Sequence, residues 1–368
     1  MIISLLSQNI SNLYTHNPFP DKMEISIEDI DDLYVPFNEL SESNVENIFL
    51  EDAKKEKMGK FYGIIADSGF GKSSFLNYLL IKLSNYPYQT FCVKLNEFPE
   101  QLNEDPKVLL NHILTKVFRI ATEVNKMDKA DVKKAQELLA HSYTYTSSEK
   151  NGINAGIKAK IQAIPMIFGI EADARGHLET QAGATIENKA NLEELIDFMN
   201  HLIDLLQKEA KMKHVVIMID ETDKITPPKS NEPSSELAKS FFGKMIPVLS
   251  KTNCTYIFVL NSKYDSKEFQ KEVIGNYFDQ CISIPRLDSV DDVKKIIEKR
   301  TKAVCGDIGL NEIWEEDGIR RLYEFYQESS LRHLMNACKF SIGKAWKDEA
   351  EIIMSFHVKE AIMDIPKY

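Results

Sequence analysis

The chain has 368 residues, of which 43% are hydrophobic and 27% are charged, a composition typical of a globular protein with enough residues for two or three folded units. Its net charge of −11 excludes a uniformly basic, nucleic-acid-binding surface, so any such contact needs a local basic patch. The five cysteines are scattered without a CxxC pair, which predicts reduced thiols in or near the core.

The first residues, MIISLLSQNI, lack the basic region that opens a signal peptide. No stretch approaches the ~18 apolar residues of a membrane span. We therefore expect a cytoplasmic protein without a membrane partner.

The N-terminal segment, residues 1–55, is acidic. Residues 21–52 contain eleven acidic residues and one lysine. We expect this segment to be partly ordered, with its acidic side chains on a solvated face.

Apolar runs alternate with helical patterns over residues 56–287. The predicted strands are 61–66, 90–98, 214–220, 254–261 and 280–287, and the predicted helices between them are 73–83, 106–125, 128–141, 191–210 and 235–251. Strands that are almost continuously apolar and alternate with helices predict an α/β fold, in which helices cover both faces of a parallel sheet. Residues 288–368 follow helical spacing throughout, which predicts an all-helical lid.

Residues 142–190 differ from the rest of this region because they are rich in small and polar residues. GIKAKIQAI (156–164) and GIEADARGHLE (169–179) alternate loosely at period two on either side of PMIF. We expect a β-hairpin-like insertion here.

The stretch ADSGFGKSS, residues 66–74, follows the first predicted strand and opens a helix. It fits a slightly relaxed phosphate-loop pattern, in which Gly69 and Gly71 let successive N–H groups turn inward to form a nest for anionic oxygens. Lys72 would reach the β- and γ-phosphates, and the hydroxyl of Ser73 would bind Mg²⁺. The alternative is a simple turn between a strand and a helix.

Polar residues also end two later strands. Asp220 and Glu221 follow an apolar strand, where Asp220 would hold Mg²⁺ and Glu221 would deprotonate an attacking water. Asn261 ends another strand and could hydrogen-bond the γ-phosphate or that water. Solvated strand-end acids and an ordinary turn residue are the alternatives.

Taken in order, these motifs resemble the AAA+ superfamily and, more narrowly, its replication-initiator and origin-recognition-like branch. ADSGFGKSS resembles Walker A, VVIMIDE resembles Walker B, and FVLN resembles sensor 1. The resemblance implies ATP and Mg²⁺ as ligands. It also implies a nucleotide-binding set comprising Asp67, Ser68, Gly69, Phe70, Gly71, Lys72, Ser73, Ser74 and Asn96.

Other matches are less specific. SSLRHLMNACKFSIGKA resembles the sensor 2 helix of the lid, which places Arg332 against the γ-phosphate, although an exposed helical arginine is the alternative. Asn96, in VKLNEF, matches the residue that can hold the catalytic glutamate in an inactive pose. YVPFNEL (34–40) resembles the N-terminal segment that borders the adenine.

The sequence departs from this branch in three ways. Lys72 and Asp220 are 148 residues apart, largely because of the insertion, and no winged-helix domain follows the lid. No arginine occurs from Gly176 to Pro285, where ring ATPases keep an arginine finger that is worth ~10³–10⁵ in rate. Arg175 is one candidate substitute, and lysines are the others: Lys251, Lys263, Lys267 and Lys271.

Three functions follow as hypotheses. The first is an AAA+ ATPase that hydrolyses ATP slowly in isolation and acts as a switch in a homo-oligomer or a complex with a partner protein. The second is a signalling or scaffold ATPase that hydrolyses little, as in anti-phage defence or transposition control, where the insertion and the acidic segment would dock partners. The third is a DNA-loading ATPase, which the net charge and the missing winged helix disfavour.

Overall fold

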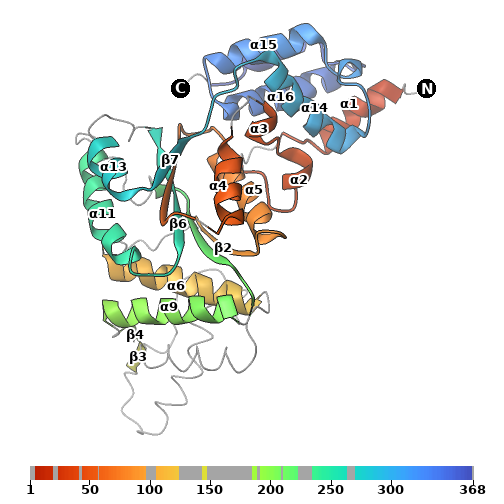
Figure 1. The fold of residues 1–368 in the computed structure, drawn as a ribbon. Coiled ribbons are helices and arrows are strands. Elements are labelled where there is room, and N and C mark those ends of the chain that lie inside the picture. Colours follow the sequence, from red (N-terminus) through yellow and green to blue (C-terminus); the bar gives the residue numbers. More distant parts are fainter. Residues whose placement is uncertain are drawn as a thin grey trace.

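The structure is a computed structural model, and it describes residues 5–19, 24–40, 44–56, 58–96, 105–123, 143–146, 185–188, 191–208, 210–222, 234–262 and 270–366. A sheet lies between two sets of helices, and a further group of helices lies beyond one end of it (Figure 1). In that group the blue C-terminal helices lie beside the red N-terminal helix, so both ends of the sequence contribute to it.

The central sheet has five strands in the order β2-β5-β6-β1-β7, and every neighbouring pair is parallel. Its strands are β1 (Phe61–Ala66), β2 (Thr90–Leu95), β5 (His214–Ile219), β6 (Thr255–Asn261) and β7 (Gln280–Ser283). The predicted α/β fold with a parallel sheet is therefore confirmed.

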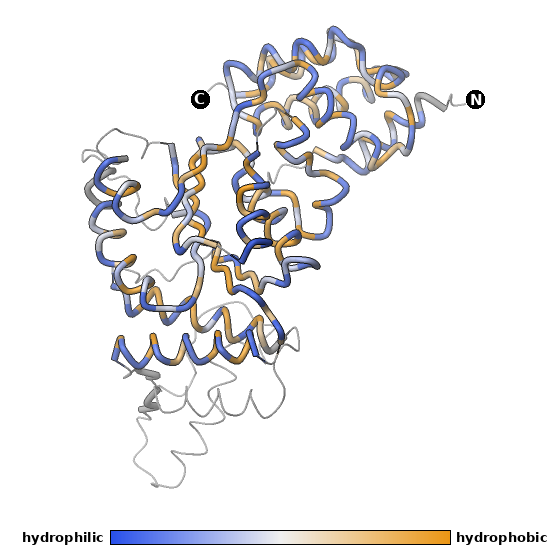
Figure 2. The backbone as a smooth tube through the Cα atoms, in the orientation of Figure 1, coloured by the Kyte–Doolittle hydropathy of each residue, from blue (hydrophilic) through white to orange (hydrophobic). Residues whose placement is uncertain are grey.

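Both faces of the sheet are buried, because alternate residues of each central strand enter different cores. In β1, Tyr62 and Ile64 face one core, whereas Phe61 and Ile65 face the other. Residues of α4 (Val45–Lys54) and α5 (Lys72–Ser84) complete the first core, and those of α6 (Pro106–Glu123), α9 (Leu192–Lys208) and α11 (Ser234–Leu249) complete the second. Hydrophobic residues recur along the central strands in Figure 2, as burial on both faces requires.

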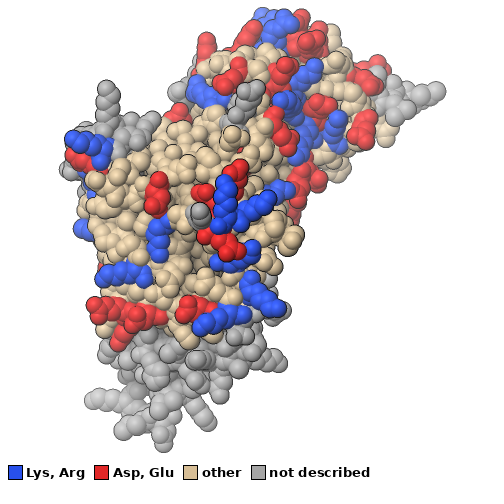
Figure 3. Space-filling view, in the orientation of Figure 1, with Lys and Arg blue, Asp and Glu red and all other residues tan. Residues whose placement is uncertain are grey.

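The C-terminal helices are α14 (Val290–Cys305), α15 (Glu316–Gln327), α16 (Leu331–Lys347) and α17 (Ser355–Met363). Helix α1 (Leu5–Thr15) packs against α14 and α16, and the short helices α2 (Ile30–Leu33) and α3 (Phe37–Leu40) pack against α14. Acidic and basic side chains are interspersed over this group on the face shown in Figure 3.

One acidic residue of the N-terminal segment is not on the solvated face that the sequence predicts. The Glu46 side chain is buried, and its carboxylate accepts hydrogen bonds from the backbone N–H groups of Phe37 (2.6 Å) and Asn38 (3.3 Å). Burial raises the pKa of this carboxyl. Glu46 therefore joins α3 to α4 instead of facing water.

Local sequence signals explain where two helices begin. The side chain of Asn191 accepts from the N–H of Glu194 (2.9 Å) and that of Glu194 accepts from the N–H of Asn191 (2.9 Å), which closes a capping box at α9. At α14, the hydroxyl of Ser289 accepts from the N–H of Asp292 (3.1 Å), while the carboxylate of Asp292 accepts from the N–H of Asp288 (3.2 Å). Helix α14 therefore begins with a serine cap, and the reciprocal bond of a capping box is shifted by one residue to Asp288.

The predicted helix 128–141 lies outside the described residues, and so do both predicted strands of the insertion. Two short strands, β3 (Tyr143–Thr146) and β4 (Thr185–Asn188), form an antiparallel pair near the ends of the insertion. All five cysteines are free, as predicted. Within the described ranges, no helix combines the length and the apolar character needed to cross a membrane.

Gly63, in the middle of β1, is required by close packing. A Cβ atom there would lie 2.4 Å from the Sγ of Cys281 and 3.2 Å from a methyl group of Leu260. We expect Gly63→Ala to lower the free energy of unfolding by about 1–3 kcal/mol, because it overpacks the core. Chemical denaturation checks this, and the double variant Gly63→Ala/Cys281→Ala should recover part of the loss. A Gly63→Ala chain as stable as the wild type would contradict the packing argument.

Candidate nucleotide site

The loop after β1 has the backbone of an anion nest. Gly69 (φ +85°) and Gly71 (φ +81°) are both left-handed, and α5 begins directly after them. The ammonium of Lys72 donates to the carbonyl oxygens of Ala66 (2.7 Å) and Asp67 (2.9 Å), at the start of the loop. The loop, the helix N-terminus and the lysine therefore converge on one point, where anionic oxygens are stabilised.

The two strand-end acids lie beyond β5, at the same edge of the sheet. Asp220 is buried, and its N–H donates to the carbonyl of Leu95 (2.8 Å) at the end of β2. Its Oδ1 accepts from the N–H of Glu221 (2.8 Å). Glu221 has a φ of +52°, an uncommon conformation for a residue other than glycine. It lines a large cavity at the carboxyl edge of the sheet, which we call the central cavity.

Sheet order brings Asn261 between these two parts. Strand β6 lies between β1 and β5, with Asn261 directly beside Ala66 in the register. Asn261 therefore adjoins the glycine loop on one side and the acidic pair on the other, and it lines the same cavity.

These side chains meet in a cavity of about 1100 Å³ at the carboxyl edge of the sheet. Its lining includes all but one of the polar residues that the sequence predicts for the site, the exception being Asp67; those present are Ser68, Lys72, Ser73, Ser74, Asn96, Asp220, Glu221, Asn261 and Arg332. Clefts of this kind at strand ends are where parallel α/β folds bind ligands. The thiol of Cys92 also lines it, but burial raises the pKa of this group to about 12, which keeps it protonated.

The first turn of α16 rests on the loop. The N–H of Arg332 donates to the carbonyl of Gly69 (3.1 Å), and a Cβ at Gly69 would lie 3.0 Å from the Oγ of Ser330. Gly69 is therefore required by a contact with the C-terminal helices as well as by its backbone angle, which sequence reasoning did not foresee.

Three predicted nucleotide-binding residues have side chains that contact other parts of the protein, although Ser74 also lines the cavity. Asp67 accepts a hydrogen bond from the hydroxyl of Ser262. The ring of Phe70 is buried against Tyr326, with the guanidinium of Arg286 4.9 Å from its centroid. The hydroxyl of Ser74 accepts from the N–H of Ile25 (2.9 Å). Asp67 and Phe70 can thus offer a ligand only their backbone groups.

Two site residues escaped the sequence-based prediction. Lys94 of β2 and Glu24 of the N-terminal segment form an ion pair, and both line the cavity. The signal for Lys94 was a single charge inside the apolar strand TFCVKL. Glu24 gave no signal of its own, since it is one of many acids in an acidic segment.

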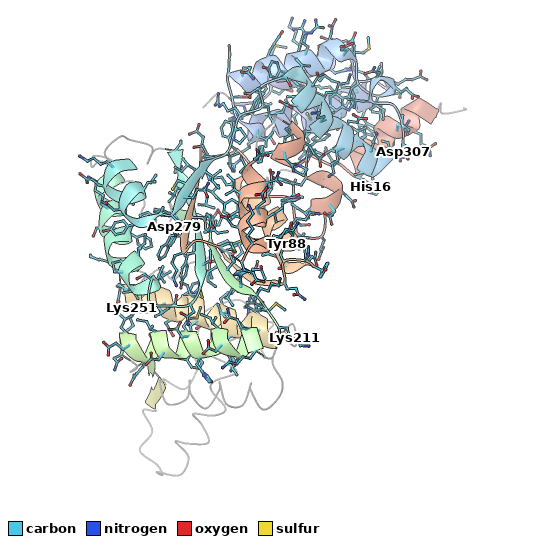
Figure 4. The ribbon with its side chains drawn as sticks, viewed as in Figure 1. His16, Tyr88, Lys211, Lys251, Asp279 and Asp307 are labelled. Carbon is cyan, nitrogen blue, oxygen red and sulfur yellow. The ribbon has the colours of Figure 1, made fainter. Side chains whose placement is uncertain are left out.

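The described candidates for a replacement arginine finger, Lys251 and Lys271, do not line the cavity. Lys251 follows α11 and precedes β6, so it lies at the amino edge of the sheet, opposite the cavity; Figure 4 labels it together with Asp279, which precedes β7 at that same edge. Lys271 is exposed in the π-helical turn Gln270–Ile274. Lys263, Lys267 and Arg175 lie outside the described residues.

P-loop NTPases hold phosphate groups at one edge of a parallel sheet, where a loop with left-handed glycines follows a buried strand and an acidic residue ends another. This chain has all of these features, and it is of this class. The model of the KAP family P-loop domain matches residues 60–263, which is more than half of the chain. The chain therefore belongs to the KAP family of P-loop proteins. The sequence-based prediction of a P-loop NTPase is confirmed.

Two solved structures of the Aeropyrum pernix ORC2 protein are similar to this chain. Its ADPNP–ADP complexes match with a TM-score of 0.46 and 12% identity, over 87% of this chain and 65% of that chain. Its ADP form matches with a TM-score of 0.45 and 11% identity, over 92% and 72%. This chain thus spans slightly less than two thirds of the first of them. Comparison with curated proteins gave no match.

Proposed function

We propose that this protein is a Mg²⁺-dependent ATPase that acts as a nucleotide-dependent switch in a complex with itself or with a partner protein. The observation that carries the proposal is the convergence of Lys72, Asp220, Glu221, Asn261 and Arg332 on one cavity. Four of these come from the ends of two neighbouring strands, β5 and β6, and from the loop after β1, while Arg332 comes from the C-terminal helices.

Each residue has a role that its position supports. The ammonium of Lys72 would exchange the neutral carbonyls of Ala66 and Asp67 for phosphate oxygens, which are stronger acceptors because they are charged. Ser73 and Asp220 would hold Mg²⁺, an oxygen-preferring cation that neutralises developing charge on the phosphates. Within the described residues no group of three or more His, Cys, Asp or Glu side chains could hold a metal ion, so the proposed Mg²⁺ would depend on Ser73, Asp220 and the phosphates of the nucleotide.

Glu221 is the proposed general base, which takes a proton from the attacking water. Asn261, between the loop and the acids, would orient that water or the γ-phosphate. Arg332 would bring positive charge from α16, so nucleotide binding would also fix the C-terminal helices, the proposed lid, on the P-loop. Asn96 directly follows β2 and lines the same cavity as Asp220 and Glu221, where it would restrain Glu221.

The adenine of the nucleotide would lie on the side of Gly71 that faces away from the central cavity. Residues 34–40 and the helices α14 and α16 enclose an apolar cavity of about 40 Å³ that Gly71 and Ser74 also line. This volume is close to that of one water molecule. Binding of an adenine there would therefore require α14 and α16 to move away from residues 34–40, which would couple the nucleotide to the lid.

A slow or non-hydrolysing scaffold ATPase is the second candidate, and one observation favours it. The segment from Gly176 to Pro285 lacks arginine, and Arg286, the next residue, is already packed on Phe70 of the same chain. A neighbour must then supply the missing charge with a lysine or with Arg175, or the rate stays low.

One experiment separates these functions. ATP turnover and molecular mass are measured together over a range of protein concentrations, with and without DNA. Turnover per chain that rises as oligomers form supports the switch. Tight ATP binding with turnover near zero at every concentration supports the scaffold, and stimulation by DNA supports the loader. An absence of ATP binding in all conditions would overturn the proposal.

A further inference from the structure

Lys94 is held among four oxygen atoms at the end of β2. Only 9% of its side chain is exposed. Its ammonium pairs with the carboxylate of Glu24, donates to the side-chain oxygen of Asn77 (3.0 Å), and lies 3.4 Å from the carbonyl oxygen of Ser73 and 3.5 Å from Oδ2 of Asp220. Lys94 thus shares its charge between two carboxylates, one of them the proposed magnesium ligand.

Glu24 belongs to a short segment, residues 24–28, which we call the N-terminal strap. The side-chain amide of Asn77 donates to Glu24 (2.9 Å) and to the carbonyl of Ile25 (2.9 Å), and the N–H of Ile25 donates to Ser74 (2.9 Å). Four residues of the strap line the central cavity: Glu24, Ser26, Ile27 and Glu28. The strap is therefore fixed to α5 and β2 directly beside the nucleotide site.

The two oxygens of Asp220 have different partners. Oδ1 accepts from the N–H of Glu221, whereas Oδ2 faces Lys94. A divalent cation that approaches this carboxylate meets an ammonium group already beside it, and two cations on one buried carboxylate repel each other. The cost is reduced if Lys94 shifts its charge toward another anion, and Glu24 is the anion with which it is already paired.

We propose that Lys94 is a positioning residue that competes with Mg²⁺ for Asp220, and that Glu24 is the alternative partner that draws Lys94 away. The strap then sets how much magnesium the site requires. This inference rests on the proposed function, since it concerns the same site and the same metal.

The test is the Mg²⁺ concentration at which binding of a fluorescent, non-hydrolysable ATP analogue is half-maximal. Glu24→Gln leaves Lys94 with Asp220 as its one carboxylate partner among the described contacts, so the midpoint should rise by about threefold or more. Lys94→Met removes the competitor, so the midpoint should fall. The double variant should behave like Lys94→Met alone, because Glu24 acts through Lys94.

Glu51→Gln is the matched control, because it makes the same change in an exposed ion pair, that of Glu51 with Lys55 (2.8 Å), and Glu51 does not line the cavity. Its midpoint should equal that of the wild type. A merely structural role for the pair would shift both single variants in the same direction, and that result would overturn the inference.

Glu24 is partly exposed, so its variant is expected to fold and can decide the question even if Lys94→Met does not. An unchanged or lower midpoint in Glu24→Gln would overturn the inference while wild-type binding leaves the proposed function intact. If the wild type fails to bind the analogue at any Mg²⁺ concentration, both proposals fall.

Discussion

Replacing Lys72 with alanine is expected to weaken ATP binding by about 10²-fold, because charge-assisted hydrogen bonds from the ammonium to phosphate oxygens are lost. The structure places this ammonium at the start of the loop, 2.7 Å and 2.9 Å from two carbonyl oxygens, so the effect should be on the nucleotide more than on the fold. Isothermal titration calorimetry measures the affinity.

Lys82→Ala is the control for this variant. Lys82 lies ten residues further along the same helix, with a surface ion pair to Asp31 (3.1 Å), and its loss should change affinity little. Equal affinities for wild type and Lys72→Ala would show that the loop does not hold phosphate.

The second large effect is expected at Glu221. Glu221→Gln should lower turnover by about 10²–10⁴-fold, the range that a general base contributes, while ATP affinity changes only slightly. The amide keeps the shape of the side chain but cannot take a proton. Phosphate release under single-turnover conditions measures the chemical step.

Glu51→Gln is again the matched control, because it makes the same chemical change at an exposed residue that does not line the cavity. Turnover should remain near the wild-type rate. If Glu221→Gln hydrolyses ATP as fast as the wild type, the base lies elsewhere and Glu221 has another role.

Much of the fold was predictable, because the strands are short, apolar and buried on both faces. The prediction of 61–66 for β1 agrees with the structure, and that of 214–220 for β5 is one residue too long. The predictions for β2 and β7 extend past Leu95 and Ser283, where these strands end, although Ile284 is still buried and its N–H donates to the carbonyl of Ile65 (2.9 Å). Helix α11 continues through Pro247, a residue that usually ends a helix.

The strand order could not be read from the sequence, since it depends on which apolar surfaces meet in space. Without the strand order, the position of Asn261 between the glycine loop and the acidic pair could be inferred only from the resemblance of FVLN to sensor 1. The N-terminal segment was the least predictable part. Its acids suggested a solvated face, yet Glu46 is buried and Glu24 pairs with a lysine 70 residues away, and both features need tertiary contacts to exist.

In the site too, some residues are predictable from local sequence and others depend on tertiary contacts. Local pattern identified the loop, the strand-end acids and Arg332, because their chemistry depends on neighbours in sequence. The support that Lys94 and Ser330 give to this site comes from distant segments, which no local pattern contains.

The central claim is that the cavity at the carboxyl edge of the sheet binds ATP with magnesium. Its most direct test is a calorimetric titration of the wild-type chain with a non-hydrolysable ATP analogue in the presence of Mg²⁺. The account predicts saturable binding at one site per chain, weakened when Mg²⁺ is removed. No detectable binding, or binding that is indifferent to both Mg²⁺ and Lys72→Ala, would contradict it.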